Sequence, residues 1–274
     1  MSYASLLAHV DADRGFAGHV SIAAELADRF HARLIGVAGW APMSVFLAED
    51  GLSGAPPVAP ELQDMKSLLD LKGKEFCAAF GTGDRKVEWR SILDFPTDAV
   101  AREARAADLV VIGGAQEKKD PFRALDPAST ILKVGRPVLV VPKGLASIPL
   151  KKIAVAWKDV REARRAVRDA LPFLQRAESV VIVEILEEGE DNTAQLRLKD
   201  VADYLSRHRV NIITQRVRPA DVTAANSLDR LIEDENIDLL VAGAYGHSRL
   251  GEWAFGGVTR ALLTESRICC LFSH

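Results

Sequence analysis

The strongest constraint on the fold of this 274-residue chain is an internal repeat. Short apolar runs occur in matched pairs, one member in each half of the sequence. The matched runs are 4–10 and 152–157, 107–113 and 237–243, and 137–141 and 269–272. Two copies of one unit predict two similar domains in tandem.

The segments between the apolar runs alternate between strand and helix patterns. Apolar residues recur with a helical period in both halves, for example at Ile22, Leu26 and Phe30, and again at Ala163, Val167 and Leu171. Further strands are expected at 33–39, 86–92, 179–185 and 210–217, and further helices at 61–80, 97–106, 193–209 and 222–235. Each half then reads β-α-β-α-β-α-β-α-β. This order predicts an α/β fold of two tandem doubly wound domains, each a five-stranded parallel sheet flanked by helices.

A segment with two prolines and a glycine, at 142–149, is the expected linker. The expected domains are therefore 1–146 and 147–274. The first half is longer than the second because of the segment 41–60, which is rich in Ala, Gly and Pro. A solvated loop is the simpler interpretation of this segment, and a lid or contact segment is the alternative.

Composition narrows the class of protein. Apolar residues make up 48% of the chain and charged residues 27%, so a packed core is expected. A net charge of −3 argues against a nucleic-acid or anionic-membrane partner, and no apolar run approaches the length of a membrane span. The first ten residues carry no Lys or Arg, and three cysteines without metal-ligand spacing suit reduced thiols. We therefore expect a cytoplasmic protein.

The segment after the apolar run 237–243 carries the clearest chemistry. It contains Gly243, Gly246, Gly256 and Gly257, with Thr259 two residues further on. Glycines let backbone N–H groups approach an anion, and a helix N-terminus adds a positive dipole. This pattern predicts a phosphate-binding loop. Tight turns and close helix–sheet packing would explain one or two of the glycines equally well.

The spacing Gly243-x2-Gly246-x9-Gly256 resembles the nucleotide signature of the universal stress protein family, and the resemblance extends over essentially the whole chain as a tandem pair. It implies the adenine nucleotide alpha hydrolase-like fold. It also implies ATP, alone or with Mg²⁺, as the cofactor of the C-terminal half only. The phosphates would lie against Gly243, Gly246, Gly256, Gly257, Val258 and Thr259. Arg249 is a phosphate ligand in this interpretation and an exposed loop residue in the alternative.

The second half departs from the family pattern in two places. Gly257 stands where the family usually has Ser or Thr. Lys158 stands where nucleotide-binding members have an Asp near the nucleoside, and a lysine cannot accept a hydrogen bond. Asp159 could take this part after a shift of one residue. The resemblance further implies that the backbone of Ile185 contacts adenine.

The first half departs in the opposite way. It keeps the aspartate, as Asp11, and the first glycine, as Gly113. The next motif positions are Gln116 and Asp126, and the register is constant, since 243 − 113, 246 − 116 and 256 − 126 all equal 130. A carboxylate at 126 would repel a phosphate, whereas it would make a good N-cap, with Pro127 opening the helix. We therefore expect no triphosphate site in the first half.

Three functional hypotheses follow. The first is a non-enzymatic universal stress protein, active in stress response or signalling, which binds at most one adenine nucleotide. The second is a nucleotide-independent interaction module of the same fold. The third, an ATP hydrolase or adenylyl transferase, finds no support in the common nucleotide and hydrolase motifs, so we assign no catalytic and no metal-binding residue.

The last apolar run of each half predicts how the halves associate. Each run is short and ends its unit, so an uncovered strand edge would expose backbone groups and apolar side chains. The resemblance implies that 138–141 and 270–272 cover one another in an internal pseudo-dimer, with homodimerisation through other faces left open. Cys269 and Cys270 are expected to be core residues, and Trp157 and Trp253 packing residues near the cleft. The four arginines of 161–168 are expected on a solvated helix face.

Overall fold

The computed structural model describes residues 2–42, 59–115, 120, 122–186, 193–219, 223–245 and 257–274. The chain divides into two compact units, Tyr3–Arg136 and one built mainly from Pro137–His274. The domain boundary expected at 146/147 stays a prediction.

The N-terminal unit is a parallel sheet with the strand order β3-β2-β1-β4. Its strands are β1 (Ser5–His9), β2 (Arg33–Gly39), β3 (Val87–Ile92) and β4 (Leu109–Gly113). Its helices are α1 (Gly18–Phe30), α3 (Ala59–Phe80), α4 (Pro96–Glu103), the 3₁₀ turn η1 (Ala104–Ala106) and α5 (Pro127–Lys133). Nearly every residue of β1, β2 and β4 is buried, as the continuous apolar runs of a sheet covered on both faces require.

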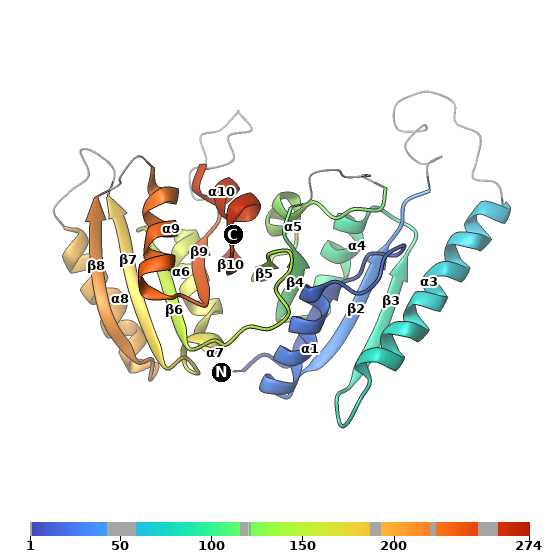
Figure 1. Cartoon of the computed structure of the whole chain (residues 1–274), viewed down its shortest axis with the longest axis horizontal. Helices are drawn as coiled ribbons and strands as arrows, with labels where there is room; N and C mark the ends of the chain where they lie inside the picture. The colour runs from blue at the N-terminus through green and yellow to red at the C-terminus, as the bar shows by residue number, and fades with distance from the viewer. Residues whose placement is uncertain are drawn as a thin grey trace. The chain divides into compact units, whose positions relative to one another are not determined.

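The C-terminal unit has the strand order β5-β10-β9-β6-β7-β8. Its strands are β5 (Val138–Val141), β6 (Lys152–Trp157), β7 (Ser179–Leu186), β8 (Ile212–Pro219), β9 (Leu239–Gly243) and β10 (Cys269–Ser273). Its helices are α6 (Arg161–Asp169), α7 (Leu171–Leu174), α8 (Ala194–Arg207), α9 (Ala224–Glu235) and α10 (Gly257–Glu265). Within this unit α9 lies in front of the strands and α8 behind them in the view of Figure 1.

The strand order reverses between β6 and β9. From β6 the chain builds outward through β7 to β8, and β9 then pairs with the other side of β6. In an open α/β sheet a crevice forms at such a reversal, beyond the carboxyl ends of the two strands. The predicted doubly wound α/β fold is confirmed, and it places the end of β9, at Gly243, beside the end of β6, at Trp157.

β5 and β10 form the one antiparallel ladder among the described strand pairs. Its register pairs Val140 with Cys270, Leu139 with Leu271 and Val138 with Phe272. All six side chains are at most 3% exposed. Cys269 and Cys270 are therefore core residues, as predicted.

The remaining expectations concern loops and surfaces. Most of the segment 41–60, and Trp253, lie outside the described residues. The arginines at 161, 164, 165 and 168 are exposed on α6, as predicted. Among the described helices, none combines the length and the apolar character that a membrane span requires.

Candidate functional site

A cavity of about 250 Å³ lies at the carboxyl ends of β6, β7 and β9. The strands reach it with Ala156, Val183 and Gly243, while α9 and α10 supply Leu228 and Thr259. The cavity thus occupies the crevice that the reversal of strand order creates.

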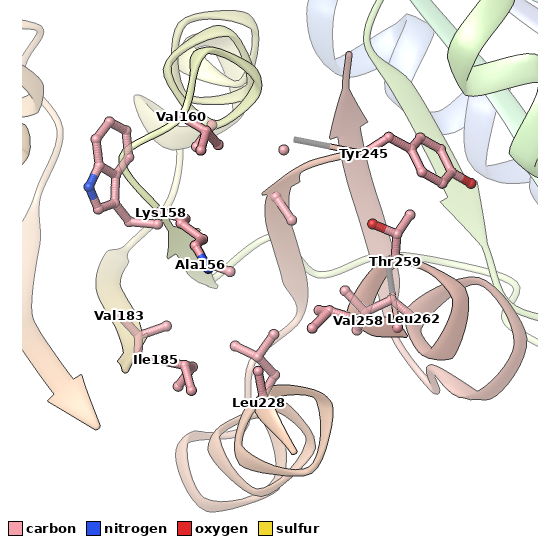
Figure 2. A pocket seen from close by; sticks show the side chains of 16 residues that line it. Ala156, Lys158, Val160, Val183, Ile185, Leu228, Tyr245, Val258, Thr259 and Leu262 are labelled. Carbon is pink, nitrogen blue, oxygen red and sulfur yellow. The ribbon is translucent and has the colours of Figure 1, made fainter. Parts of the chain in front are cut away.

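The cavity has one side whose strand and helix residues are mainly apolar and one side that carries hydroxyl groups. Figure 2 shows Val183, Ile185 and Leu228 gathered on one side below Lys158, with the hydroxyls of Tyr245 and Thr259 on the other, beside Val258 and Leu262. Val183 and Ile185 share one face of β7 because they are two residues apart. This division suits a ligand with one flat apolar part and one hydrogen-bonding or charged part.

The polar side is formed by the start of α10. Gly257 is the first residue of this helix and lines the cavity, followed by Val258 and Thr259. A Cβ added at Gly257 would meet no atom within 4 Å among the described residues. The first N–H groups of a helix lack partners within it, so this end of α10 presents donors and a positive dipole to the cavity.

Gly243 has a packing role of its own. A Cβ at this position would lie 2.5 Å from the backbone nitrogen of Ala163 and 2.7 Å from the carbonyl carbon of Glu162. The start of α6 can therefore approach β9 only if residue 243 is glycine. The packing interpretation is correct for this glycine, and the same close approach forms one wall of the cavity.

Tyr245 is a cavity residue that the sequence analysis missed. Its backbone is left-handed, with φ of 59°, in a residue type that rarely adopts this conformation. The ring of His274 packs edge-on at 6.3 Å, and a ring nitrogen of His274 lies 3.1 Å from the carbonyl oxygen of Ala244. The position of Tyr245 between Gly243 and Gly246 was the available signal.

Lys158 and Asp159 point to different places. Lys158 lines the cavity, whereas Asp159 accepts a 2.6 Å hydrogen bond from Arg164 and lines a separate groove. Strand register also makes Lys158 the counterpart of Asp11. β1 pairs Leu6 with Leu109, and β6 pairs Ile153 with Leu239, the counterpart of Leu109. Asp11 and Lys158 each lie five residues after the paired residue of their strand. The cavity of the second half therefore contains a cation at the position where the first half has a carboxylate.

The other predicted site residues divide into two groups. The structure brings Lys158, Ile185, Gly243, Gly257, Val258 and Thr259 together around the cavity. Gly246, Arg249 and Gly256 lie outside the described residues. Leu228 and Leu262 were missed as well, because a helical apolar stripe does not distinguish a cavity wall from core.

In the N-terminal unit, two histidines occupy the place that corresponds to the cavity of the C-terminal unit. The Nε2 atom of His19 donates a 2.8 Å hydrogen bond to the carbonyl oxygen of His9, and the two rings stack at 6.3 Å. A Cβ on Gly113 would lie 3.1 Å from the ring of His19.

Burial lowers the pKa of His9 to about 3, and it also lowers the pKa of His19. Burial raises the pKa of Asp11.

The first half's counterpart of the glycine loop is held by its own side chains. Asp126 is the N-cap of α5, where its carboxylate accepts a 2.9 Å hydrogen bond from the backbone N–H of Ser129, as predicted. Arg123 lies 3.2 Å from Asp13, which follows β1, and 4.7 Å from the ring of Trp40, which follows β2. These contacts tie the loop to the carboxyl ends of β1 and β2.

The structure is that of a doubly wound α/β protein with a cavity at the carboxyl edge of its C-terminal sheet. Within the described residues no group of three or more His, Cys, Asp or Glu side chains is arranged to hold a metal ion. Residues 149–272 match the model of the universal stress protein family. The C-terminal half of the chain is therefore similar to the universal stress protein family.

Solved structures extend the likeness in fold to the whole chain. A universal stress protein from Archaeoglobus fulgidus superposes with a TM-score of 0.72 at 13% identity, covering 98% of this chain and 97% of its own. A functionally unknown protein and a putative universal stress protein, both from Pseudomonas aeruginosa, give TM-scores of 0.61 and 0.58 at 13% and 15% identity. Each covers 99% of this chain, and this chain covers 92% and 93% of them. The comparison with curated proteins found no match.

Proposed function

We propose that this chain is a non-enzymatic stress-response or signalling protein that binds one adenine nucleotide, ATP, in the cavity of its C-terminal half. The observation that carries the proposal is the cavity at the reversal between β6 and β9, which joins apolar side chains to the N-terminal residues of α10. The base would lie against Val183, Ile185 and Leu228, and the phosphates beside Gly257 and Thr259. Heat release and chromatography of purified protein would test directly whether nucleotide is carried.

Lys158 supports the competing hypothesis of a nucleotide-independent interaction module. A lysine cannot accept a hydrogen bond from the amine of adenine, so this contact is absent from the site. The same ammonium group favours an anionic ligand in the cavity, which supports nucleotide binding. The two hypotheses therefore differ in one measurable quantity, the affinity of the intact protein for ATP.

Gly257→Asp is expected to weaken ATP binding at least tenfold to hundredfold. A Cβ at residue 257 would meet no atom within 4 Å among the described residues, and a carboxylate stabilises a helix N-terminus, so the fold should be kept. The carboxylate would repel the phosphates and compete for the N–H groups of α10, each charge-assisted hydrogen bond being worth roughly 1.5–3 kcal/mol. Titration calorimetry measures the effect.

Gly257→Asn is the matched control, because it has the same size without the charge. It should weaken ATP binding much less than Gly257→Asp. Equal affinity of Gly257→Asp and the unchanged protein would place the nucleotide elsewhere. Absence of ATP binding by the unchanged protein would favour the nucleotide-independent module.

One ATP per chain is the expected stoichiometry. In the N-terminal unit Asp126 caps α5, and Arg123 contacts Asp13 and Trp40, so the equivalent loop is engaged with its own side chains. Calorimetry should give a single site, and a crystal grown with excess ATP should show ligand only in the C-terminal unit. A triphosphate bound against Asp126 would contradict this expectation.

We also infer that the two halves associate through β5 and β10 as an internal pseudo-dimer. The pairing of Val140 with Cys270 supports this inference, because 270 − 140 equals 130, the offset that relates the glycine motif to its counterpart. When equivalent residues of two repeats pair in an antiparallel ladder, a local two-fold axis passes between them and relates the two strands.

A further inference from the structure

A second recess in the C-terminal unit borders the proposed nucleotide cavity and shares Trp157 with it. It is a groove of about 460 Å³ between α6 and α8, and we call it the α6–α8 groove. Its volume is in the range of small-molecule sites. The nucleotide proposal makes no use of it.

The floor of the α6–α8 groove is apolar and contains an unsatisfied donor. Trp157, Val167 and Val201 line it, and each is at most 8% exposed. The Nε1 atom of Trp157 is buried and has no hydrogen-bond acceptor among the described residues. A buried N–H without an acceptor is unfavourable.

Three of the charged side chains of the groove, Asp159, Arg164 and Arg197, already have partners. Arg164 of α6 is 2.6 Å from Asp159, and Arg197 of α8 is 2.6 Å from the buried Glu184. Within each pair the two opposite charges compensate one another. The charge of a ligand that fits the groove therefore depends on the groove's other charged side chains.

The remaining charges are one cation and one anion on opposite walls. Arg168 lies on α6 and Asp200 on α8, and both are exposed. Neither forms an ion pair within the described part of the chain. The ring of Tyr204, which is 40% exposed, adds a flat apolar surface on the α8 wall.

We propose that the α6–α8 groove binds a small zwitterion with a flat apolar body. Its carboxylate pairs with Arg168, its ammonium group pairs with Asp200, and its body lies over Trp157 and beside Tyr204. Arg168 can hold a carboxylate in a bidentate pair, which fixes orientation as well as sign. This site is independent of the nucleotide proposal, because none of its charged groups lines the nucleotide cavity.

The probe is 4-(aminomethyl)benzoate, which carries its two charges at opposite ends of an aromatic ring. The readout is the indole N–H signal of Trp157 in a ¹H–¹⁵N NMR spectrum, assigned with Trp157→Phe. We expect a saturable shift, with an affinity at least about tenfold higher than for 4-methylbenzoate or benzylamine, which each lack one charge. Arg168→Gln and Asp200→Asn should each weaken binding of the zwitterion about tenfold.

Matched controls lie on the same helix outside the groove. Lys199→Gln and Asp203→Asn change exposed charges of α8 and should leave the affinity unchanged. Gly257→Asp should also leave it unchanged, which separates this site from the nucleotide cavity that Trp157 also lines. The proposal is overturned if the zwitterion gives no saturable shift, if a single-charge analogue binds as tightly, or if both groove variants bind like the controls.

Discussion

Lowering the pH from 7 to 4 is expected to reduce the free energy of unfolding by on the order of 3 kcal/mol through His9 alone. The folded-state pKa of His9 is lowered by burial from 6.5 to about 3, so the unfolded chain binds its proton first as the pH falls. The stability that neutral His9 contributes is therefore complete above pH 6.5 and is lost progressively between pH 6.5 and pH 3. His19 acts in the same direction, because burial lowers its pKa too.

Asp11 and the backbone carbonyl of His9 reduce this dependence of stability on pH. The pKa of Asp11 is raised by burial, so its contribution has the opposite sign: it develops as the pH falls through the raised folded-state pKa and is complete below the ordinary value of 3.8. The charge of Asp11 and the hydrogen bond to the carbonyl of His9 both favour protonated His19, without outweighing its burial. The pH values nearest 6.5 lie farthest from the ordinary pKa of Asp11 and are therefore the best place to observe the histidines.

Urea unfolding at several pH values measures the effect, and His9→Gln isolates it. Removing one proton-binding group should lower the slope of stability against pH by up to about 1.4 kcal/mol per pH unit. His19→Gln should lower it too, while its amide can still donate to the carbonyl of His9. If both variants keep the slope of the unchanged protein, the buried histidines do not control its acid stability.

The sequence predicted the strands well because a parallel sheet covered on both faces needs continuous apolar runs. The run 33–39 is β2 without a change of boundary, and 179–185 differs from β7 by one residue. The repeat offset of 130 residues drew attention to Asp126, and its residue type, followed by Pro127, correctly predicted an N-cap. Capping could be predicted because it depends on local chemistry alone. Local chemistry and burial pattern together were sufficient for the fold.

The walls of the cavity were harder to predict. Leu228 and Leu262 satisfy the pattern of a core-facing helix stripe, and nothing in that pattern shows that they border a hollow. Asp159 was considered for the cavity, but consecutive side chains at the end of a strand alternate in direction, so Lys158 enters the cavity and Asp159 does not. The α6–α8 groove depends on how two helices lie on a sheet, which sequence periodicity does not specify.

Val140→Lys is expected to destabilise the C-terminal unit by about 3 kcal/mol or more. Val140 is 3% exposed and pairs with Cys270, which is 1% exposed. An ammonium group at this position would be buried without a counter-charge, and the cost of such a charge is large. Leu132→Lys is the control, because Leu132 is 44% exposed on α5 and the same change there should stay within about 0.5 kcal/mol.

The reactivity of the three cysteine thiols shows which part of the protein Val140→Lys disrupts. Cys77 is exposed, whereas Cys269 and Cys270 are buried and burial raises the pKa of Cys270 to about 12, so one thiol of three should react readily with a disulfide reagent in the native protein. If β5 covers β10, Val140→Lys should make Cys270 reactive although residue 140 belongs to the first half of the sequence. Leu132→Lys should keep one reactive thiol. A Val140→Lys variant with one reactive thiol and the stability of the Leu132→Lys control would show that β10 does not depend on β5 for its cover.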